Sequence, residues 1–262
     1  MTALIYIGGY GRSGSTLLES LLTIRPDVLA CGEIAGCLRA RIDRGCTCGQ
    51  SRTECSIWGP VYSRPGGPRG MTHAELTLAL LEGASGDYGF LVDSSKTAWG
   101  ALSAPFKLRR ALGNRFHLVH VVRDPRGAFW SNAGGTRKRG LVRFPFLQHL
   151  KTSLGWWVAN LSCELFSWRY PASYTRVRYE EVASSHQAVL ESLFGALSKG
   201  EAQALDPGVR NNRHQLYGNH NRYKDFTPAD VREDARWKTA MPGAQRAFVS
   251  ALTWPLRLKY GY

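Results

Sequence analysis

The segment GYGRSGST, residues 9–16, decides the fold of this chain. It follows ALIYI, residues 3–7, a short and partly β-branched apolar run that predicts a buried strand. Leucines at positions 17, 18, 21 and 22 come next, at the spacing of a helix. A glycine-rich turn between a strand and a helix presents backbone N–H groups to an anion. The sequence therefore predicts a phosphate-binding loop, with a tight structural turn as the alternative.

Two phosphate-loop motifs fit these residues. Glycines at 9, 11 and 14 form the GxGxxG pattern of a dinucleotide-binding fold, and Glu33 follows 19 residues later, where such folds place an acid that binds the ribose. The same segment matches the P-loop pattern GxxxxGK(S/T), except that Ser15 occupies the lysine position. The loop keeps a cation at Arg12 and hydroxyls at Ser13, Ser15 and Thr16 that could surround one phosphate. Neither match decides alone.

A second predicted anion site helps to choose between the two motifs. The apolar run FHLVHVV, residues 116–122, predicts another buried strand, and Arg123 follows it directly. Ser131 lies eight residues further, about two helical turns along the next predicted helix. A cation and a hydroxyl at this place could hold a second phosphate, for which a dinucleotide fold has no use. The alternative is that Arg123 and Asp124 form a capping pair and that Ser131 is solvated.

The rest of the chain predicts an α/β fold: a single P-loop-type domain over residues 1–262, with a central, largely parallel sheet flanked by helices. Further strands are expected at 90–92 and 174–179, and helices at 72–83, 145–170 and 242–252. Residues 43–70, rich in Cys, Gly and Pro, predict a long excursion, and the polar, basic segment 206–226 an exposed loop or lid. The face of helix 145–170 that we expect to be buried contains Leu147, Leu150, Leu154, Trp157, Leu161, Leu165 and Trp168.

Composition limits the function classes. The chain has 262 residues, 44% hydrophobic content and a formal net charge of +14, which excludes intrinsic disorder as the main state and favours an anionic partner. No stretch is apolar enough to predict a membrane span, and the first residues resemble a strand more than a signal peptide, so we expect a cytoplasmic protein. The basic residues are scattered, without a nucleic-acid-binding signature, which argues against a nucleic-acid partner.

Six cysteines in a chain of this length do not predict a disulfide scaffold. Cys46, Cys48 and Cys55 lie close together in the excursion, but a CxC pair and one further cysteine match a zinc knuckle poorly. The sequence therefore favours ordinary or redox-labile thiols over a metal site.

The two anion motifs together resemble those of sulfotransferases that use 3′-phosphoadenosine 5′-phosphosulfate (PAPS). GYGRSGSTLLESLL (9–22) is similar to the segment of that family that binds the 5′-phosphosulfate, and VVRDPRGAFWS (121–131) to the one that binds the 3′-phosphate. Weaker matches follow in the family's order: PDVLACGE (26–33), VDSSKTA (92–98), VRYEEV (177–182), YGNHNRY (217–223) and, like tails of bacterial members, WPLRLKYGY (254–262). The resemblance covers most of the chain.

Local similarity extends to the tyrosylprotein and carbohydrate branches of that family. PDVLACGE resembles the tyrosylprotein branch, in which its glutamate is the catalytic base. This chain departs from that branch because no cysteine precedes the lysine of DSSK to pair with Cys31. The substrate of the branch therefore does not carry over.

The resemblance implies a role for each matching residue. Glu33 is expected to be the general base, with a surface carboxylate or helix cap as the alternative, and Arg12 and Lys96 to stabilise charge on the departing bisphosphate. The 5′-phosphate is expected to contact Ser13, Gly14, Ser15 and Thr16. The 3′-phosphate is expected to contact Arg123 and Ser131, with Arg222 closing over it and Tyr179 near the adenine or its phosphate.

The expected reaction moves a sulfuryl group from PAPS to a hydroxyl without a metal. The acceptor can be a small molecule, a glycan, a lipid, a phenolic compound or a peptide tyrosine, and its specificity is expected to lie in the excursion and in segment 134–150. The remaining alternatives are a P-loop nucleotide kinase or NTPase, which lacks its lysine here, and a Rossmann-type oxidoreductase, which leaves Arg123 and Ser131 unexplained.

Overall fold

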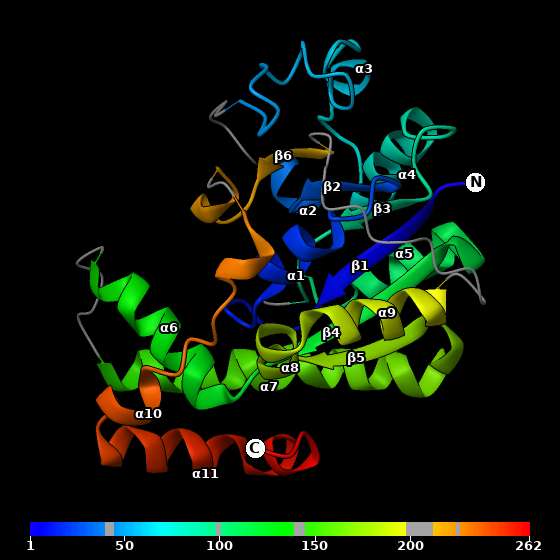
Figure 1. Ribbon diagram of the computed structural model, residues 1–262. Helices are drawn as coiled ribbons and strands as arrows, with labels where there is room; N and C mark the ends of the chain where they lie inside the picture. The colour runs from blue at the N-terminus through cyan, green and yellow to red at the C-terminus, as the bar shows by residue number, and fades with distance from the viewer. Residues whose placement is uncertain (40–44, 98–100, 139–144, 198–211, 224–225) are drawn as a thin grey trace.

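A central sheet of six parallel strands organises the protein (Figure 1). The computed structural model describes residues 1–39, 45–97, 101–138, 145–197, 212–223 and 226–262. The strand order is β5-β4-β1-β3-β2-β6, and every neighbouring pair is parallel. The strands are β1 (Ala3–Gly8), β2 (Val28–Gly32), β3 (Phe90–Asp93), β4 (Phe116–Val122), β5 (Tyr174–Arg178) and β6 (Arg213–Tyr217). The predicted α/β fold with a parallel sheet is confirmed.

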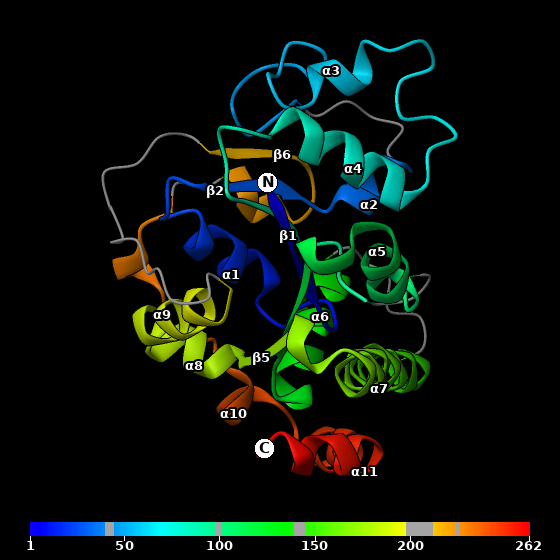
Figure 2. The ribbon, with the colours of Figure 1, turned by 90° about the vertical axis from the view of Figure 1, so that its right-hand side faces the viewer.

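Helices connect the strands and cover both faces of the sheet. They are α1 (Ser15–Leu22), α2 (Ile34–Cys37), α3 (Gly59–Tyr62), α4 (His73–Gly83), α5 (Ala104–Leu112), α6 (Pro125–Lys138), α7 (Pro145–Arg169), α8 (Tyr179–Ser184), α9 (His186–Leu197), α10 (Trp237–Ala240) and α11 (Gly243–Lys259). Short 3-10 turns are η1 (Gly113–Arg115), η2 (Pro171–Ser173), η3 (His220–Tyr223) and η4 (Pro228–Asp230). Figure 2 shows α1, α8 and α9 on one side of the sheet and α4, α5 and α7 on the other. Not one helix in the described ranges has both the length and the apolar character needed to cross a membrane.

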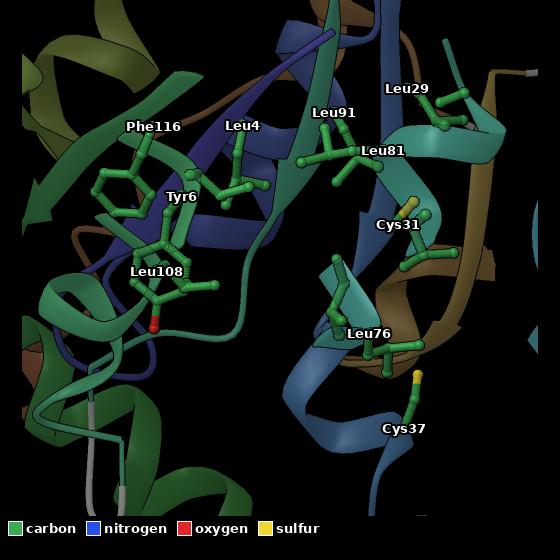
Figure 3. Close-up of a cluster of buried hydrophobic side chains, with 14 of the residues drawn as sticks. Leu4, Tyr6, Leu29, Cys31, Cys37, Leu76, Leu81, Leu91, Leu108 and Phe116 are labelled. Atoms are coloured by element: carbon green, nitrogen blue, oxygen red, sulfur yellow. The ribbon is translucent and has the colours of Figure 1, made fainter. Parts of the chain in front are cut away.

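The two sides of the sheet form separate parts of the core. Along β1, Leu4 and Tyr6 belong to the cluster under α4, α5 and α7, whereas Ile5 and Ile7 belong to the cluster under α1 and α9. Figure 3 shows the first cluster, where Tyr6 lies beside Phe116 of β4. A parallel sheet with both faces covered needs apolar residues at successive positions, because neighbouring side chains point to opposite faces. This explains why the strands could be found as continuous apolar runs.

The predicted helix at 145–170 is confirmed as α7, but its predicted buried face is only partly right: Trp157 and Leu161 pack against a core cluster as half-buried residues. Leu154, Leu165 and Trp168 are exposed, the last by 84%. The buried face instead includes Trp156, Ala159, Cys163 and Phe166. Small residues on this face let the helix approach the sheet closely, since a Cβ on Gly8 of β1 would lie 3.1 Å from the Cys163 sulfur. Both faces of α7 are therefore apolar, and both carry large side chains.

The two segments expected to lack regular structure differ from each other. The described part of the predicted excursion, residues 45–70, contains one regular element, the short helix α3. The predicted lid at 206–226 is partly wrong, because 213–217 form the edge strand β6, with His214 and Gln215 buried. Residues 206–211 and 224–225 lie outside the described residues, as do 139–144 of the predicted specificity segment. A strand at an edge can carry polar residues that would suggest a loop in sequence.

Candidate functional site

Five strands end at the same edge of the sheet, and each leads to a predicted site residue. The loop 9–14 follows β1, Glu33 follows β2, Lys96 comes three residues after β3, Arg123 follows β4, and Tyr179 follows β5. Because the strands are parallel, their carboxyl ends meet at one edge, which is where open α/β sheets bind ligands. Sheet topology thus gathers residues that are far apart in sequence.

The phosphate loop depends on a left-handed backbone at Gly9, Arg12 and Gly14, whose φ angles are 109°, 71° and 93°. A Cβ on Gly9 would lie 2.4 Å from the Val121 carbonyl oxygen, so the turn requires glycine there. Gly14 is the N-cap of α1, where its carbonyl accepts the Leu18 N–H at 2.9 Å. The free N–H groups of a helix's first turn point toward such a loop. This is the arrangement that the strand–glycine–helix pattern predicted.

Ser13 is the strongest indication that the loop holds a ligand. The side chain is 1% exposed, and its Oγ has no hydrogen-bond partner within the described ranges of the chain. A buried hydroxyl without a partner is costly, and most such groups in proteins are hydrogen-bonded. An anionic oxygen in the loop would satisfy it. Ser15, the first residue of α1, is also buried, and Thr16 follows it half-buried.

Tyr179 and Arg123 pack against this loop from the neighbouring strands. A Cβ on Gly14 would lie 2.5 Å from the Tyr179 ring, so the ring rests directly on the loop backbone. The Arg123 guanidinium carbon lies 4.2 Å from the centroid of the same ring, and the Asp234 backbone N–H donates to the Tyr179 hydroxyl at 2.9 Å. The tyrosine ring therefore packs between the loop and the arginine.

Arg123 and Arg12 join the two predicted anion segments. Arg123 donates from Nη1 to the Arg12 carbonyl oxygen at 3.0 Å and from Nη2 to the Asp234 carbonyl oxygen at 2.8 Å. Arg12 donates from Nε to the Ser131 hydroxyl at 3.1 Å. A guanidinium carries five N–H donors, so the two carbonyl bonds of Arg123 use part of its capacity. Asp124 pairs with Arg126 at 2.6 Å and not with Arg123 as in the capping alternative.

The predicted base and its predicted lysine are in direct contact. The Lys96 ammonium donates to Glu33 Oε1, and both side chains are largely buried. Lys96 has a left-handed backbone with φ 67°. Its side chain passes the phosphate loop, because a Cβ on Gly11 would lie 4.0 Å from the lysine Cδ. The ion pair thus stands beside the anion loop at the edge of the sheet.

Asp93, at the end of β3, supports both members of this pair, and sequence analysis missed it. Its Oδ1 accepts from the backbone N–H of Ser95 at 2.9 Å and of Ile34 at 3.3 Å, which are the neighbours of Lys96 and Glu33. Its Oδ2 lies 2.6 Å from His73 Nε2. The signal in sequence was a carboxylate directly after the apolar run FLV.

Glu19 is a second buried carboxyl that sequence analysis missed. It is 1% exposed, and burial raises its pKa from 4.5 to about 7. Its oxygens accept from the Gly32 backbone N–H and from the Ser94 hydroxyl, both at 2.8 Å. Glu19 therefore ties α1 to the ends of β2 and β3, the strands that lead to Glu33 and Lys96. The feature of the sequence that could have indicated it is a glutamate on the apolar side of a predicted helix.

Arg222 occupies a different place from the other predicted phosphate ligands. It is 3% exposed, and its guanidinium donates to the carbonyl oxygens of Gly218 at 2.7 Å and Leu216 at 3.2 Å. In the ranges that the structure describes, no hydrogen bond joins it to Arg123 or Ser131. It holds the turn after β6, where a Cβ on Gly218 would lie 3.6 Å from Glu33 Cγ.

The structure also brings Cys46, Cys48 and Cys55 together with His214 of β6, and their potential ligand atoms all lie within 4.8 Å of one another. Sequence analysis had the three cysteines but not the histidine, because it lies 159 residues beyond Cys55.

Comparisons with known proteins match the fold. A scan against protein-family models and a search of curated protein sequences found no match. Among solved structures, the chain is similar to the sulfotransferase domain from the curacin biosynthetic pathway, with a TM-score of 0.57 and 18% identity over 96% of this chain and 97% of the other.

Two further sulfotransferase structures align over nearly the whole chain. The domain from the Synechococcus PCC 7002 olefin synthase has a TM-score of 0.56 and 16% identity over 100% of this chain and 95% of that one. The sulfotransferase from Alicyclobacillus acidocaldarius has a TM-score of 0.56 and 12% identity, over 98% and 94%. At these identities the comparisons establish a shared fold, that of sulfotransferase domains.

Proposed function

We propose that the protein is a sulfotransferase that transfers a sulfuryl group from PAPS to a hydroxyl of an acceptor. The observation that carries the proposal is the contact between Glu33 and Lys96 beside the phosphate loop. In-line displacement needs one group to accept the proton of the attacking hydroxyl and another to stabilise charge on the leaving oxygen. A carboxylate and an ammonium at the carboxyl edge of the sheet fit these two tasks. The shared fold with solved sulfotransferase domains supports the same reaction class.

The loop after β1 is the proposed site of the 5′-phosphate end of PAPS. Its backbone N–H groups and the hydroxyls of Ser13, Ser15 and Thr16 are the donors, and Gly14 lets the chain turn into α1. The buried and unpartnered Ser13 Oγ supports this assignment. We assign the 3′-phosphate to Arg123 and Ser131 and the neighbourhood of the adenine to Tyr179, whose ring lies between Gly14 and the Arg123 guanidinium.

The proposed reaction is a single displacement at sulfur. The acceptor oxygen forms a bond to sulfur, the bond between sulfur and the phosphate oxygen breaks, and adenosine 3′,5′-bisphosphate leaves with the electron pair. Glu33 takes the hydroxyl proton at a carboxylate oxygen. Lys96 and Arg12 stabilise the charge on the departing oxygen. A sulfuryl group carries less negative charge than a phosphoryl group, so we expect these side-chain cations to suffice without a metal.

Arg222 has a supporting role in this proposal. It bonds the Gly218 carbonyl, and Gly218 lies against the side chain of Glu33. We therefore revise its expected role from a ligand of the 3′-phosphate to a positioning residue for the base. The acceptor remains a hydroxyl on a small molecule, a glycan, a lipid, a phenolic compound or a peptide tyrosine, and we expect the reaction to occur in the cytoplasm.

Calorimetric titration tests the donor site directly. The purified protein is titrated with adenosine 3′,5′-bisphosphate without metal and, in parallel, with ATP and Mg²⁺. We expect tight binding of the bisphosphate and weak binding of ATP. The reverse result would favour a P-loop kinase or NTPase, and binding of neither nucleotide would overturn the assignment of the loop.

Two variants separate catalysis from donor binding once a panel of hydroxyl acceptors has yielded a substrate. Glu33→Gln should lower turnover by ~10²–10⁴, the usual contribution of a general base, with unchanged affinity for the bisphosphate. Glu82→Gln, at an exposed carboxylate of α4, is the matched control. Arg123→Ala should chiefly weaken binding of the bisphosphate. Near-normal turnover in Glu33→Gln would refute the assignment of the base.

A further inference from the structure

Four metal-ligating side chains meet between the Cys-rich excursion and the edge strand β6. Cys46, Cys48 and Cys55 come from the excursion, and His214 comes from the middle of β6. The Cys55 sulfur lies 3.2 Å from His214 Nδ1 and 3.6 Å from the Cys46 sulfur. Three of the four residues are buried, and Cys48 is half-buried. This cluster is built from β6 and the excursion, whereas the phosphate loop follows β1.

We propose that these four side chains bind one structural zinc ion. Three thiolates and one imidazole form a Cys₃His set, which is a common structural zinc site. Zinc–sulfur bonds of about 2.3 Å and zinc–nitrogen bonds of about 2.0 Å in a tetrahedron put neighbouring ligand atoms roughly 3.5–3.8 Å apart. The spacing of the four ligand atoms, all within 4.8 Å, allows this geometry with small side-chain adjustments. All four positions are taken by protein, which makes the site structural and not catalytic.

A disulfide explains the cluster less well. Bonding Cys46 to Cys55 would use two thiols and leave the Cys48 thiol and the His214 imidazole in the same confined place without a common partner. The two sulfur atoms are 3.6 Å apart, well beyond the ~2.05 Å of a disulfide. A metal ion accounts for all four groups at once.

Hydrogen bonds of Thr47 hold the two halves of the cluster together. The Thr47 N–H donates to the Gln215 carbonyl at 3.2 Å, and the Gln215 N–H donates to the Thr47 hydroxyl at 2.9 Å. That hydroxyl donates in turn to the Arg213 carbonyl at 2.6 Å. Thr47 lies between two of the cysteines, and Arg213 and Gln215 flank the histidine. The bonds therefore fix the register that places sulfur and imidazole ligands opposite each other.

The small apolar core of the excursion also supports a metal site. Residues 45–70 contain the single short helix α3, and their largest buried apolar side chain is Trp58, with Val61 beside it. The Trp58 indole donates to the His214 carbonyl oxygen at 2.6 Å, directly behind the cluster. Small lobes with so little apolar burial are commonly held by disulfides or metals. Figure 2 shows the loops around α3 extending beyond β6, away from the rest of the sheet.

Metal analysis of the intact protein tests the proposal. Protein purified without chelators should contain one zinc ion per chain by inductively coupled plasma mass spectrometry. Cys46→Ala, Cys55→Ala and His214→Ala should each lose the zinc, whereas Cys31→Ala, which removes a buried thiol of β2 outside the cluster, should keep it. Zinc retained in all variants, or iron in place of zinc, would overturn the proposal.

A second measurement covers variants that fail to fold. Wild-type protein is stripped with a chelator and reloaded with Co²⁺ alone, which should give the thiolate charge-transfer and ligand-field bands of a tetrahedral sulfur-rich site. Thiol titration of the denatured, stripped protein should find all six cysteines free. Two missing thiols, indicating a disulfide, or Co²⁺ that binds without these bands would overturn the assignment.

Discussion

Replacing Glu19 with glutamine should change how the stability of the protein depends on pH. Glu19 is fully buried, and this burial raises its pKa from 4.5 to about 7. Glutamine has nearly the same shape and can still accept the Gly32 N–H, while its amide can donate to the Ser94 hydroxyl oxygen. The substitution therefore removes the titration while it keeps the contacts with Gly32 and Ser94.

The size of the effect follows from the shift. Between pH 4.5 and pH 7 the folded protein keeps the Glu19 proton while the unfolded chain releases it, so the folded state binds more protons in this window. The free energy of unfolding must then fall as the pH rises, and the loss stops above pH 7. A shift of this size corresponds to about 3 kcal/mol over the window, at 1.36 kcal/mol per pH unit. Below pH 4.5 the contribution is fully present.

Urea unfolding followed by tryptophan fluorescence measures this difference. The unfolding free energies of the wild type and of Glu19→Gln are compared at pH 5 and pH 8. The free energy of unfolding of the variant relative to that of the wild type should be about 2–3 kcal/mol higher at pH 8 than at pH 5. Near-ultraviolet circular dichroism at pH 5 shows whether the variant keeps its fold. Parallel pH profiles for the two proteins would refute the reasoning.

Three further predictions concern buried groups and the loop. Burial lowers the pKa of His120 to about 4, so its contribution to the free energy of unfolding should increase as the pH rises from 4 to 6.5. NMR titration of the ring should show no protonation at pH 6. Asp93→Asn should lower kcat with little change in bisphosphate affinity, measured by kinetics and calorimetry, and equal losses in both would contradict a positioning role. Gly14→Ala should weaken bisphosphate binding at least about tenfold in calorimetry, because the new Cβ would clash with the Tyr179 ring in a left-handed backbone.

The elements that sequence predicted best are those whose physical cause is local. Strands of a sheet covered on both faces are continuous apolar runs, and β1 and β4 could be located for that reason. The glycine-rich turn of the predicted phosphate loop could be located because it needs glycine at fixed positions. The buried face of α7 was predicted only in part, because two faces are apolar and the closeness of Gly8 to Cys163, which selects between them, is a tertiary contact.

The supporting groups of the candidate site could not be predicted, because they act across large sequence separations. Asp93 bonds the backbone next to Glu33, 59 residues away, and Glu19 bonds Ser94, 75 residues away. A carboxylate at a strand end or on a helix gives no indication in sequence of the backbone it will meet. The role expected for Arg222 rested on motif resemblance alone, whereas its buried position follows from the turn after β6.

Strand order divides the candidate site into two halves. The proposed ligands of PAPS come from β5, β4 and β1, on one side of the sheet's middle, whereas Lys96 and Glu33 follow β3 and β2, on the other side. Next to β2 lies β6, which carries the turn against Glu33 at its end and His214 in its middle. An acceptor hydroxyl must approach the base from the half that does not hold the donor. The acceptor should therefore meet the β6 side, where the excursion is attached, and a metal ion that fixes the excursion to β6 would fix the wall of the acceptor site.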